Sequence, residues 1–275
     1  MSEMDLKRFL DEDVGSGDIT TNTLVPDISG KAYIICEEDA VVAGLEEAAE
    51  IFRLLGVRSK CHVADGQIVW RDTKVMTLEG RLRGILTGER VALNFLMRMS
   101  GIATETAAVI RKVREKDPDL QIAGTRKTTP GFRYFEKKAI ALGGGKPHRF
   151  GLYDMVLIKD NHIIACGGIE NALSVIDRIP SDIQKEIEVS TIDEGVLAAE
   201  MGADIIMADN MSPADTKELR EKVRAIREEI VIEASGNVTK ENVIDYAGCA
   251  DFVSLGSLTH SVKAVQFSLD IERKT

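Results

Sequence analysis

A run of cationic side chains between residues 124 and 162 is the clearest chemical signal in the sequence. It reads GTRKTTPGFRYFEKKAIALGGGKPHRFGLYDMVLIKDNH and contains Arg126, Lys127, Arg149 and Lys159. The whole chain is acidic, with 35 Lys and Arg against 45 Asp and Glu. Local positive charge is enough to concentrate a small anion in a cleft, whereas nucleic-acid binders more often show a broad basic face. The run therefore predicts a pocket for a small anionic substrate.

The chain after residue 120 alternates short apolar runs with amphipathic segments, which is the pattern of βα units around a parallel sheet. The predicted strands span residues 121–124, 155–159, 187–190, 204–209, 230–235 and 251–256. The predicted helices between them span residues 132–142, 169–178, 193–201 and 213–229. Because these strands are nearly all apolar, we expect them to be buried on both faces.

Polar or glycine residues follow every predicted strand. In βα-barrels the chemistry lies at this carboxyl end of the sheet. The strand-end residues are Thr125, Arg126, Lys127, Lys159, Glu188, Asp209, Ser235, Gly236, Asn237, Gly256 and Ser257. Glycine lets backbone N–H groups approach oxygens closely, so the last two loops suit a phosphate group. We expect a single site at the carboxyl ends of the strands that combines cations, two acids and glycine loops.

The first 100 residues are organised differently. Strand-like segments at 33–37, 40–43 and 67–70 are interleaved with helical patterns at 46–55 and 86–99. This favours a separate α+β domain over residues 1–100, followed by the βα domain over residues 101–261.

Cysteine spacing and the N-terminal sequence bear on the cellular compartment. The four cysteines are dispersed without a CxxC pair, so neither a zinc site nor a disulfide framework is predicted. The first 18 residues are charged where a signal peptide needs an apolar run, and no apolar stretch reaches membrane-spanning length. We expect a cytoplasmic protein.

The motifs closely resemble those of the quinolinate phosphoribosyltransferases. Besides the cationic run, the resemblance rests on residues 12–21, 88–104, 187–190, 202–211, 233–237 and 254–261, in family order. It implies the type II phosphoribosyltransferase architecture: an N-terminal α/β sandwich domain over residues 1–100, to which 262–275 return, and an incomplete α/β barrel over 101–261. It also implies transfer of phosphoribosyl from 5-phosphoribosyl-1-pyrophosphate (PRPP) to quinolinate with magnesium. The products would be nicotinate mononucleotide, an intermediate of NAD biosynthesis, with pyrophosphate and carbon dioxide.

The resemblance also implies roles for individual residues. Guanidinium groups bind carboxylates bidentately, which suits Arg126 and Arg149, with His148, to the two carboxylates of quinolinate. Arg90 would join them from the neighbouring subunit of a homodimer, which could assemble further. The residues implied to bind PRPP are Thr125, Lys127, Lys159, Ser235, Gly236, Asn237, Leu255, Gly256 and Ser257. Glu188 and Asp209 would hold Mg²⁺, directly or through water, and form the catalytic set with Lys127 and Lys159.

Each residue also has a structural alternative. Arg126 and Lys127 could form a solvated turn, and Gly143 to Gly145 could be a helix end. A salt bridge between Glu188 and Lys159 is compatible with metal binding. We leave His162 and His260 outside the site as structural histidines.

Two positions depart from the family pattern. Pro147 stands before His148 where the family usually has Asn, and Ala208 stands where it usually has Leu. The first change resembles a paralogous, molybdenum-transport-associated phosphoribosyltransferase family, whereas residues 157–162, LIKDNH, match the quinolinate enzymes. A third reading is a non-catalytic anion-binding module on the same scaffold. Retention of Glu188 and Asp209 favours an enzyme, because a module that only binds a dicarboxylate needs no metal ligands.

Overall fold

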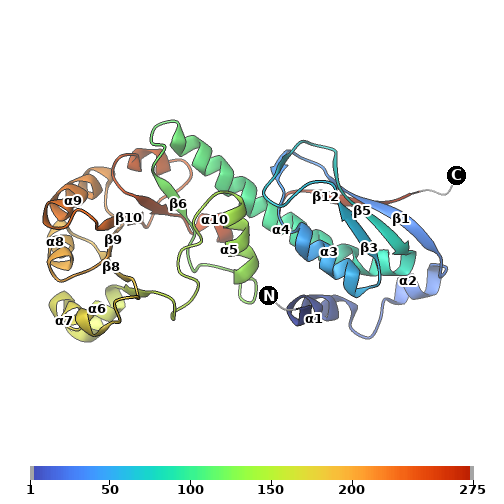
Figure 1. Cartoon of the computed structure of the whole chain (residues 1–275), viewed down its shortest axis with the longest axis horizontal. Coiled ribbons are helices and arrows are strands. Elements are labelled where there is room, and N and C mark those ends of the chain that lie inside the picture. Colours follow the sequence, from blue (N-terminus) through green and yellow to red (C-terminus); the bar gives the residue numbers. More distant parts are fainter. Residues whose placement is uncertain (1–2, 273–275) are drawn as a thin grey trace. The chain divides into compact units, whose positions relative to one another are not determined.

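The computed structural model describes residues 3–272 of the chain, which form two compact units (Figure 1). Unit 1 comprises the residues up to 105 together with those from 262 onward, and unit 2 comprises residues 106–261. Helix α4 (Leu82–Arg114) runs without a break through both, past the predicted boundary at residues 100 and 101. Gly101 does not end this helix. A Cβ there would lie 2.4 Å from the Lys263 carbonyl oxygen, so the glycine permits a close backbone approach.

Unit 1 contains a four-stranded antiparallel sheet in the order β12-β1-β5-β3. Its strands are β1 (Ser29–Cys36), β3 (Arg58–Cys61), β5 (Thr73–Arg81) and β12 (Phe267–Ile271). A separate pair consists of β2 (Ala40–Val41) and β4 (Ile68–Val69). The helices of this unit are α1 (Glu3–Val14), α2 (Ile19–Leu24), α3 (Leu45–Leu54) and the first part of α4. The last strand, β12, joins the sheet by pairing with β1.

The core of unit 1 combines side chains of the sheet and of α3, and α4 lies close to the end of α3. A Cβ at Gly88 of α4 would lie 2.7 Å from the Leu55 side chain, so glycine lets α4 approach the end of α3. Ile34, Phe52 and Met76 are fully buried in this unit. Among residues 3–272, no helix has both the length and the apolar character needed to cross a membrane.

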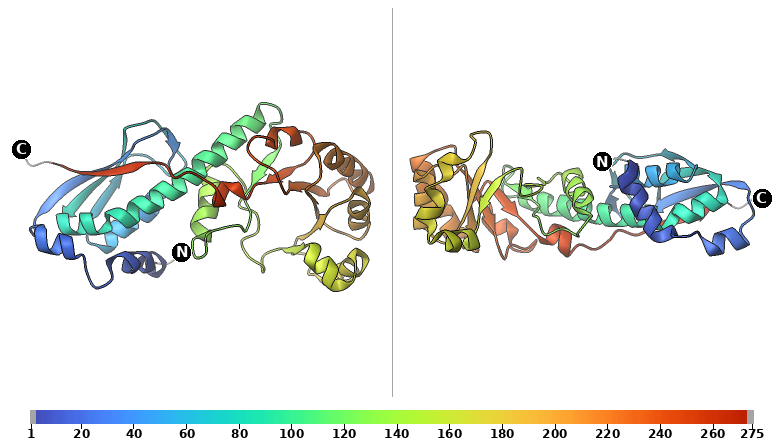
Figure 2. Two further views of the ribbon diagram at one scale, coloured as in Figure 1. Left: turned by 180° about the vertical axis from the view of Figure 1, so that it is seen from behind. Right: turned by 90° about the horizontal axis from the view of Figure 1, so that it is seen from below.

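Unit 2 is built on a six-stranded parallel sheet in the order β6-β11-β10-β9-β8-β7. The strands are β6 (Gln121–Ala123), β7 (Val156–Ile158), β8 (Lys185–Val189), β9 (Ile205–Asp209), β10 (Val231–Ser235) and β11 (Phe252–Ser254). Strands β6 and β7, which come first in the sequence of unit 2, form the two edges of the sheet and do not pair with each other. The result is an incomplete α/β barrel, as predicted, with α8 and α9 on its outside (Figures 1 and 2).

The helices of unit 2 follow the strands, with the main differences from prediction between residues 160 and 178. They are α5 (Arg133–Leu142), α6 (Asp160–Cys166), α7 (Ile169–Leu173), α8 (Ile192–Glu200), α9 (Pro213–Ile226) and α10 (Ser257–His260), with 3₁₀ turns η1 (Ile176–Arg178) and η2 (Val243–Tyr246). The predicted helix over 169–178 is divided into α7 and η1, and α6 was not predicted. Gly167, at φ 79°, ends α6 in the left-handed conformation, so the chain restarts as α7.

The two faces of the six-stranded sheet differ in chemistry. Its outer face contributes Ile187, Ile206 and Ile232 to the apolar core that it shares with the helices. Its inner face carries carboxylates, including the buried Glu186 and Glu233. The inner face is thus buried at these positions, as predicted, but it is polar there. Side chains alternate along a strand, so one apolar face is enough to hold the helices.

Candidate active site

The carboxyl ends of the unit 2 strands border a cavity of about 430 Å³. Its lining residues are Gly124, Thr125, Arg126, Lys127, His148, Arg149, Leu157, Lys159, Glu188, Met207, Asp209, Glu233, Ser235 and Ser254. The fold thus brings together the predicted cations, both predicted acids and Ser235. The predicted residues outside this lining are Gly236, Asn237, Leu255, Gly256 and Ser257, together with Arg90 of unit 1.

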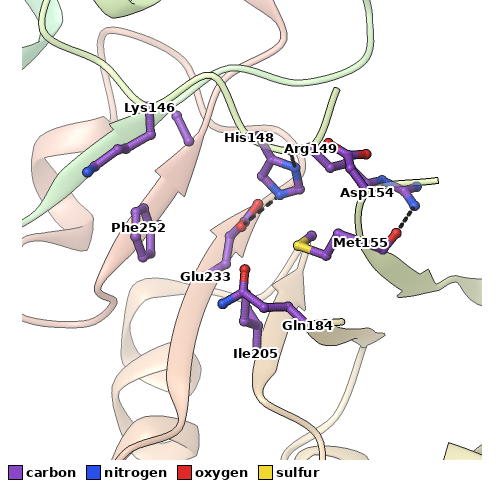
Figure 3. A pocket seen from close by; sticks show the side chains of 10 residues that line it. Lys146, His148, Arg149, Asp154, Met155, Gln184, Ile205, Glu233 and Phe252 are labelled. Atoms are coloured by element: carbon purple, nitrogen blue, oxygen red, sulfur yellow. Dashed lines mark hydrogen bonds and ion pairs between the residues drawn. The ribbon is translucent and has the colours of Figure 1, made fainter. Parts of the chain in front are cut away.

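Two arginines face this cavity without a carboxylate partner. Arg149 is only 7% exposed, and its Nη1 donates to the carbonyl oxygen of Met155 at 3.2 Å (Figure 3). The Arg126 Nε is buried with no hydrogen-bond partner. Burial, and then the nearby charge of Arg126, lower the pKa of Arg149. Neither guanidinium forms an ion pair with the residues that the structure describes, so an anion from outside would stabilise both charges.

Lys127 is positioned by backbone and hydroxyl contacts. Its N–H donates to Thr125 Oγ1 at 3.0 Å, and its carbonyl oxygen accepts from Thr259 Oγ1 at 2.8 Å. A Cβ at Gly256 would lie 2.9 Å from Lys127 Cδ, so this glycine leaves room for the lysine side chain. The N–H of Leu255 already donates to the Ala123 carbonyl oxygen at 2.9 Å, and therefore is not free to bind a phosphate.

The two predicted metal ligands lie at neighbouring strand ends. Glu188 on β8 accepts from Lys159 Nζ at 2.5 Å, which is the salt bridge anticipated from the sequence. Asp209 on β9 accepts from Asn210 Nδ2 at 2.6 Å. Gly236 has a φ of 77°, and a Cβ there would approach Asp209 Oδ1 to 2.8 Å. The glycine therefore lets the Asn210 and Asp209 side chains pack closely against the backbone.

The barrel interior holds a cluster of His148, Glu186 and Glu233. His148 Nε2 lies 3.2 Å from Glu233 Oε2 and 3.5 Å from Glu186 Oε2. The Arg149 N–H donates to Nδ1 at 2.7 Å, which places the histidine proton on Nε2, facing the carboxylates. Burial, opposed by His148, raises the pKa of Glu186 to about 7. The three ligand atoms lie within 4.8 Å of one another, but a proton on Nε2 makes this a hydrogen-bonded cluster rather than a metal site.

Sequence reasoning assigned His148 to the substrate and missed both glutamates. In the structure both ring nitrogens of His148 are engaged within the protein. A signal was available, because an acid inside an apolar strand is costly unless it is paired. The partner could not be known from the sequence, since His148 and Glu233 are 85 positions apart.

A second cavity, of about 290 Å³, lies beside the same cluster (Figure 3). Its lining includes His148, Arg149 and Glu233, which it shares with the first cavity, and residues near the amino ends of the strands such as Gln184 and Phe252. His148 and Arg149 thus border both spaces, so the conformation of this dipeptide decides the shape of the site.

Fold and cavity together define an α/β-barrel protein that presents unpaired cations and two carboxylates to a small polyanionic ligand. Family models agree with this class. The model described as "Quinolinate phosphoribosyl transferase, C-terminal domain" matches residues 102–270, and the corresponding N-terminal domain model matches residues 18–100. The chain belongs to the quinolinate phosphoribosyltransferase family.

Relatives and solved structures are similar along nearly the whole chain. A probable nicotinate-nucleotide pyrophosphorylase (carboxylating) of Archaeoglobus fulgidus is 42% identical over 258 residues, which cover 93% of this chain and 98% of the relative. The crystal structure of a NadC deletion mutant superposes with a TM-score of 0.93 at 36% identity, covering 99% of this chain and 97% of that one. The nicotinate-nucleotide pyrophosphorylase of Francisella tularensis gives a TM-score of 0.91 at 34% identity, covering 99% and 98%.

Proposed function

We propose that the protein transfers the phosphoribosyl group of PRPP to quinolinate and releases carbon dioxide, pyrophosphate and nicotinate mononucleotide. The observation that carries this proposal is the pair of cavity-facing arginines, Arg126 and Arg149, without carboxylate partners of their own. A dicarboxylate supplies two negative groups to such a pair, and guanidinium groups bind carboxylates with two parallel hydrogen bonds. The names of the family relatives, which specify a carboxylating nicotinate-nucleotide pyrophosphorylase, support the same substrate.

PRPP would occupy the part of the cavity bordered by Lys127, Lys159 and Ser235. Lysine ammonium groups suit its phosphate charges, and the Ser235 hydroxyl can donate to a phosphate oxygen. Glu188 and Asp209 fit a hard divalent cation, because both offer carboxylate oxygens to the same cavity. Bound there, Mg²⁺ would neutralise charge on the pyrophosphate.

The proposed reaction breaks two bonds and forms two. The pyridine nitrogen of quinolinate bonds to C1 of the ribose while the bond from C1 to the pyrophosphate oxygen breaks. The bond from C2 of the ring to its carboxylate then breaks, carbon dioxide leaves, and a proton replaces it at C2. Arg126 and Arg149 would orient the ring nitrogen, and Glu188 would stabilise positive charge that develops on the ribose.

The two departures from the family pattern leave the lining side chains unchanged. Ala208 is 1% exposed and packs in the apolar core on the outer face of the sheet. Pro147 contributes a backbone carbonyl to Lys137 and does not line the cavity. Quinolinate is therefore favoured over the base of a paralogous transferase.

We also propose a cytoplasmic homodimer in which Arg90 reaches the site of the partner subunit. Arg90 is exposed on α4, and its side chain forms no hydrogen bond or ion pair with another described residue. An exposed arginine at the surface is common. The support for a role in the site is therefore its place in the family motif at residues 88–104.

A turnover assay tests the function directly. The purified protein is incubated with PRPP, Mg²⁺ and either quinolinate or nicotinate, and nicotinate mononucleotide is separated by chromatography. We expect turnover of quinolinate and at least about 100-fold less of nicotinate, because losing one carboxylate leaves a partly buried cation unpaired. Comparable turnover of both acids would overturn the substrate assignment, and binding without turnover would establish an anion-binding module.

A further inference from the structure

Lys137 is a buried cation that the proposed reaction does not use. It lies on α5 and is only 3% exposed. Burial, and then repulsion from Arg133, lower its pKa to about 8. Lysine is almost never fully buried without a strong reason, because desolvating an ammonium group is costly.

The contacts of Lys137 are with backbone rather than with an acid. Its Nζ donates to the carbonyl oxygen of Pro147 and, at 3.4 Å, to that of His148. These two carbonyls precede the residues that border both cavities. The ammonium group therefore holds the chain at the point where the site begins.

The segment that Lys137 holds directly follows Lys146, which is fixed by backbone hydrogen bonds to Ile122 and Gly124. His148 has a φ of 56°, in the left-handed region that is unfavourable for a residue with a side chain. No backbone–backbone hydrogen bond of residues 147–149 occurs within the described part of the chain. Side chains hold the residues that follow: Arg133 Nη1 donates to the Phe150 carbonyl oxygen at 3.1 Å, and Asp154 accepts from the Phe150 and Gly151 N–H groups.

The backbone conformation that Lys137 holds orients two side chains of the site, those of His148 and Arg149. His148 turns its ring toward Glu233, and Arg149 reaches the Met155 carbonyl (Figure 3). Release of the Pro147 and His148 carbonyls would let the strained φ relax and move both side chains.

We propose that Lys137 is a positioning residue for the quinolinate-binding half of the site. It fixes the Pro147-His148-Arg149 backbone so that Arg149 faces the carboxylates of quinolinate. This inference rests on the proposed function, because it assigns the binding of quinolinate to Arg149. It concerns quinolinate alone, since the PRPP-facing residues Lys159, Glu188 and Asp209 lie on other elements.

The test compares Lys137→Met with Lys138→Met, the same change at the next position of α5. For Lys137→Met we expect the KM for quinolinate to rise about tenfold or more, because hydrogen bonds to a charged donor are each strong enough for that change. The KM for PRPP should stay within about threefold, a difference too small to reflect a lost contact. Lys138→Met should leave both constants unchanged.

Melting temperature separates positioning from general support. Removal of a buried charge offsets the loss of its hydrogen bonds, so Lys137→Met should melt at or above the temperature of the unchanged protein. Lys137→Gln, which keeps one donor, should recover part of the quinolinate affinity and serves if the Met variant does not fold. An equal rise of both KM values, or a lower melting temperature with unchanged quinolinate KM, would overturn the inference. Failure of the unchanged protein to use quinolinate would instead overturn the proposed function.

Discussion

Truncation of Arg149 gives a direct measure of the proposed carboxylate site. The residue is 7% exposed, the only described hydrogen bond of its guanidinium group is to the Met155 carbonyl, and burial lowers its pKa. Removing one partner of a buried charge pair costs 2–5 kcal/mol in general, and we take about 2–3 kcal/mol because the guanidinium borders an open cavity. Arg149→Ala should therefore weaken quinolinate binding roughly 30- to 150-fold.

Isothermal titration calorimetry with quinolinate provides the assay, and two further variants provide the comparison. Arg149→Lys keeps the charge but loses the bidentate geometry, so its quinolinate affinity should lie between that of the unchanged protein and that of Arg149→Ala. Arg178→Ala removes an exposed cation of the same unit that lies outside the cavity and should have no effect. Quinolinate affinity of Arg149→Ala within about threefold of the unchanged protein would refute the assignment, since that is far less than a lost buried ion pair.

Three further predictions address the acids, the assembly and the pH dependence. Glu188→Gln and Asp209→Asn should abolish magnesium-dependent turnover but keep quinolinate binding, as measured by calorimetry; equal losses of binding would contradict separate roles. Arg90→Ala and Lys127→Ala should each be nearly inactive, whereas a refolded random mixture should recover about a quarter of full activity, because half of the two-fold dimers are hybrids with one intact site. No recovery despite subunit exchange would place Arg90 outside the partner's site. Folding lowers the pKa of Lys137 to about 8. Between about pH 8 and 10.5 the folded state therefore binds fewer protons than the unfolded state, and the free energy of unfolding should rise with pH by up to about 3 kcal/mol. Urea unfolding at pH 7.5 and 10 should show this rise in the unchanged protein but not in Lys137→Met.

The strand-end residues could be predicted from the sequence because parallel strands all end at one edge of a sheet. This rule alone brought Arg126, Lys159, Glu188 and Asp209 to one cavity. The same rule does not predict the role of a glycine whose missing side chain makes room for a neighbouring residue. Gly256 makes room for the Lys127 side chain, and no local pattern predicts which side chain will pass a given glycine.

The misses in the fold have local causes. Strand β3 reads RSKC and is mostly exposed, so it carries no apolar signal and forms only by pairing with β5. Helix α6 is short and contains the polar residues DNH in its first turn, so no apolar periodicity predicts it. The Lys137 contacts join a helix to a loop ten positions later, and such contacts depend on packing that a sequence pattern does not contain.

The pairing of β12 with β1 has a consequence for the order of events during synthesis. Tyr33, which lies within that pairing, donates its hydroxyl to Glu272, 239 positions later, at 2.9 Å. Strand β1 leaves the ribosome early, but its partner on this side emerges only after all of unit 2. The nascent chain therefore carries an unprotected edge of β1 throughout translation of the barrel, and an unpaired edge can bind other strands. Chaperone dependence and aggregation should consequently be greatest for nascent chains stalled before residue 267, even when the barrel is already folded.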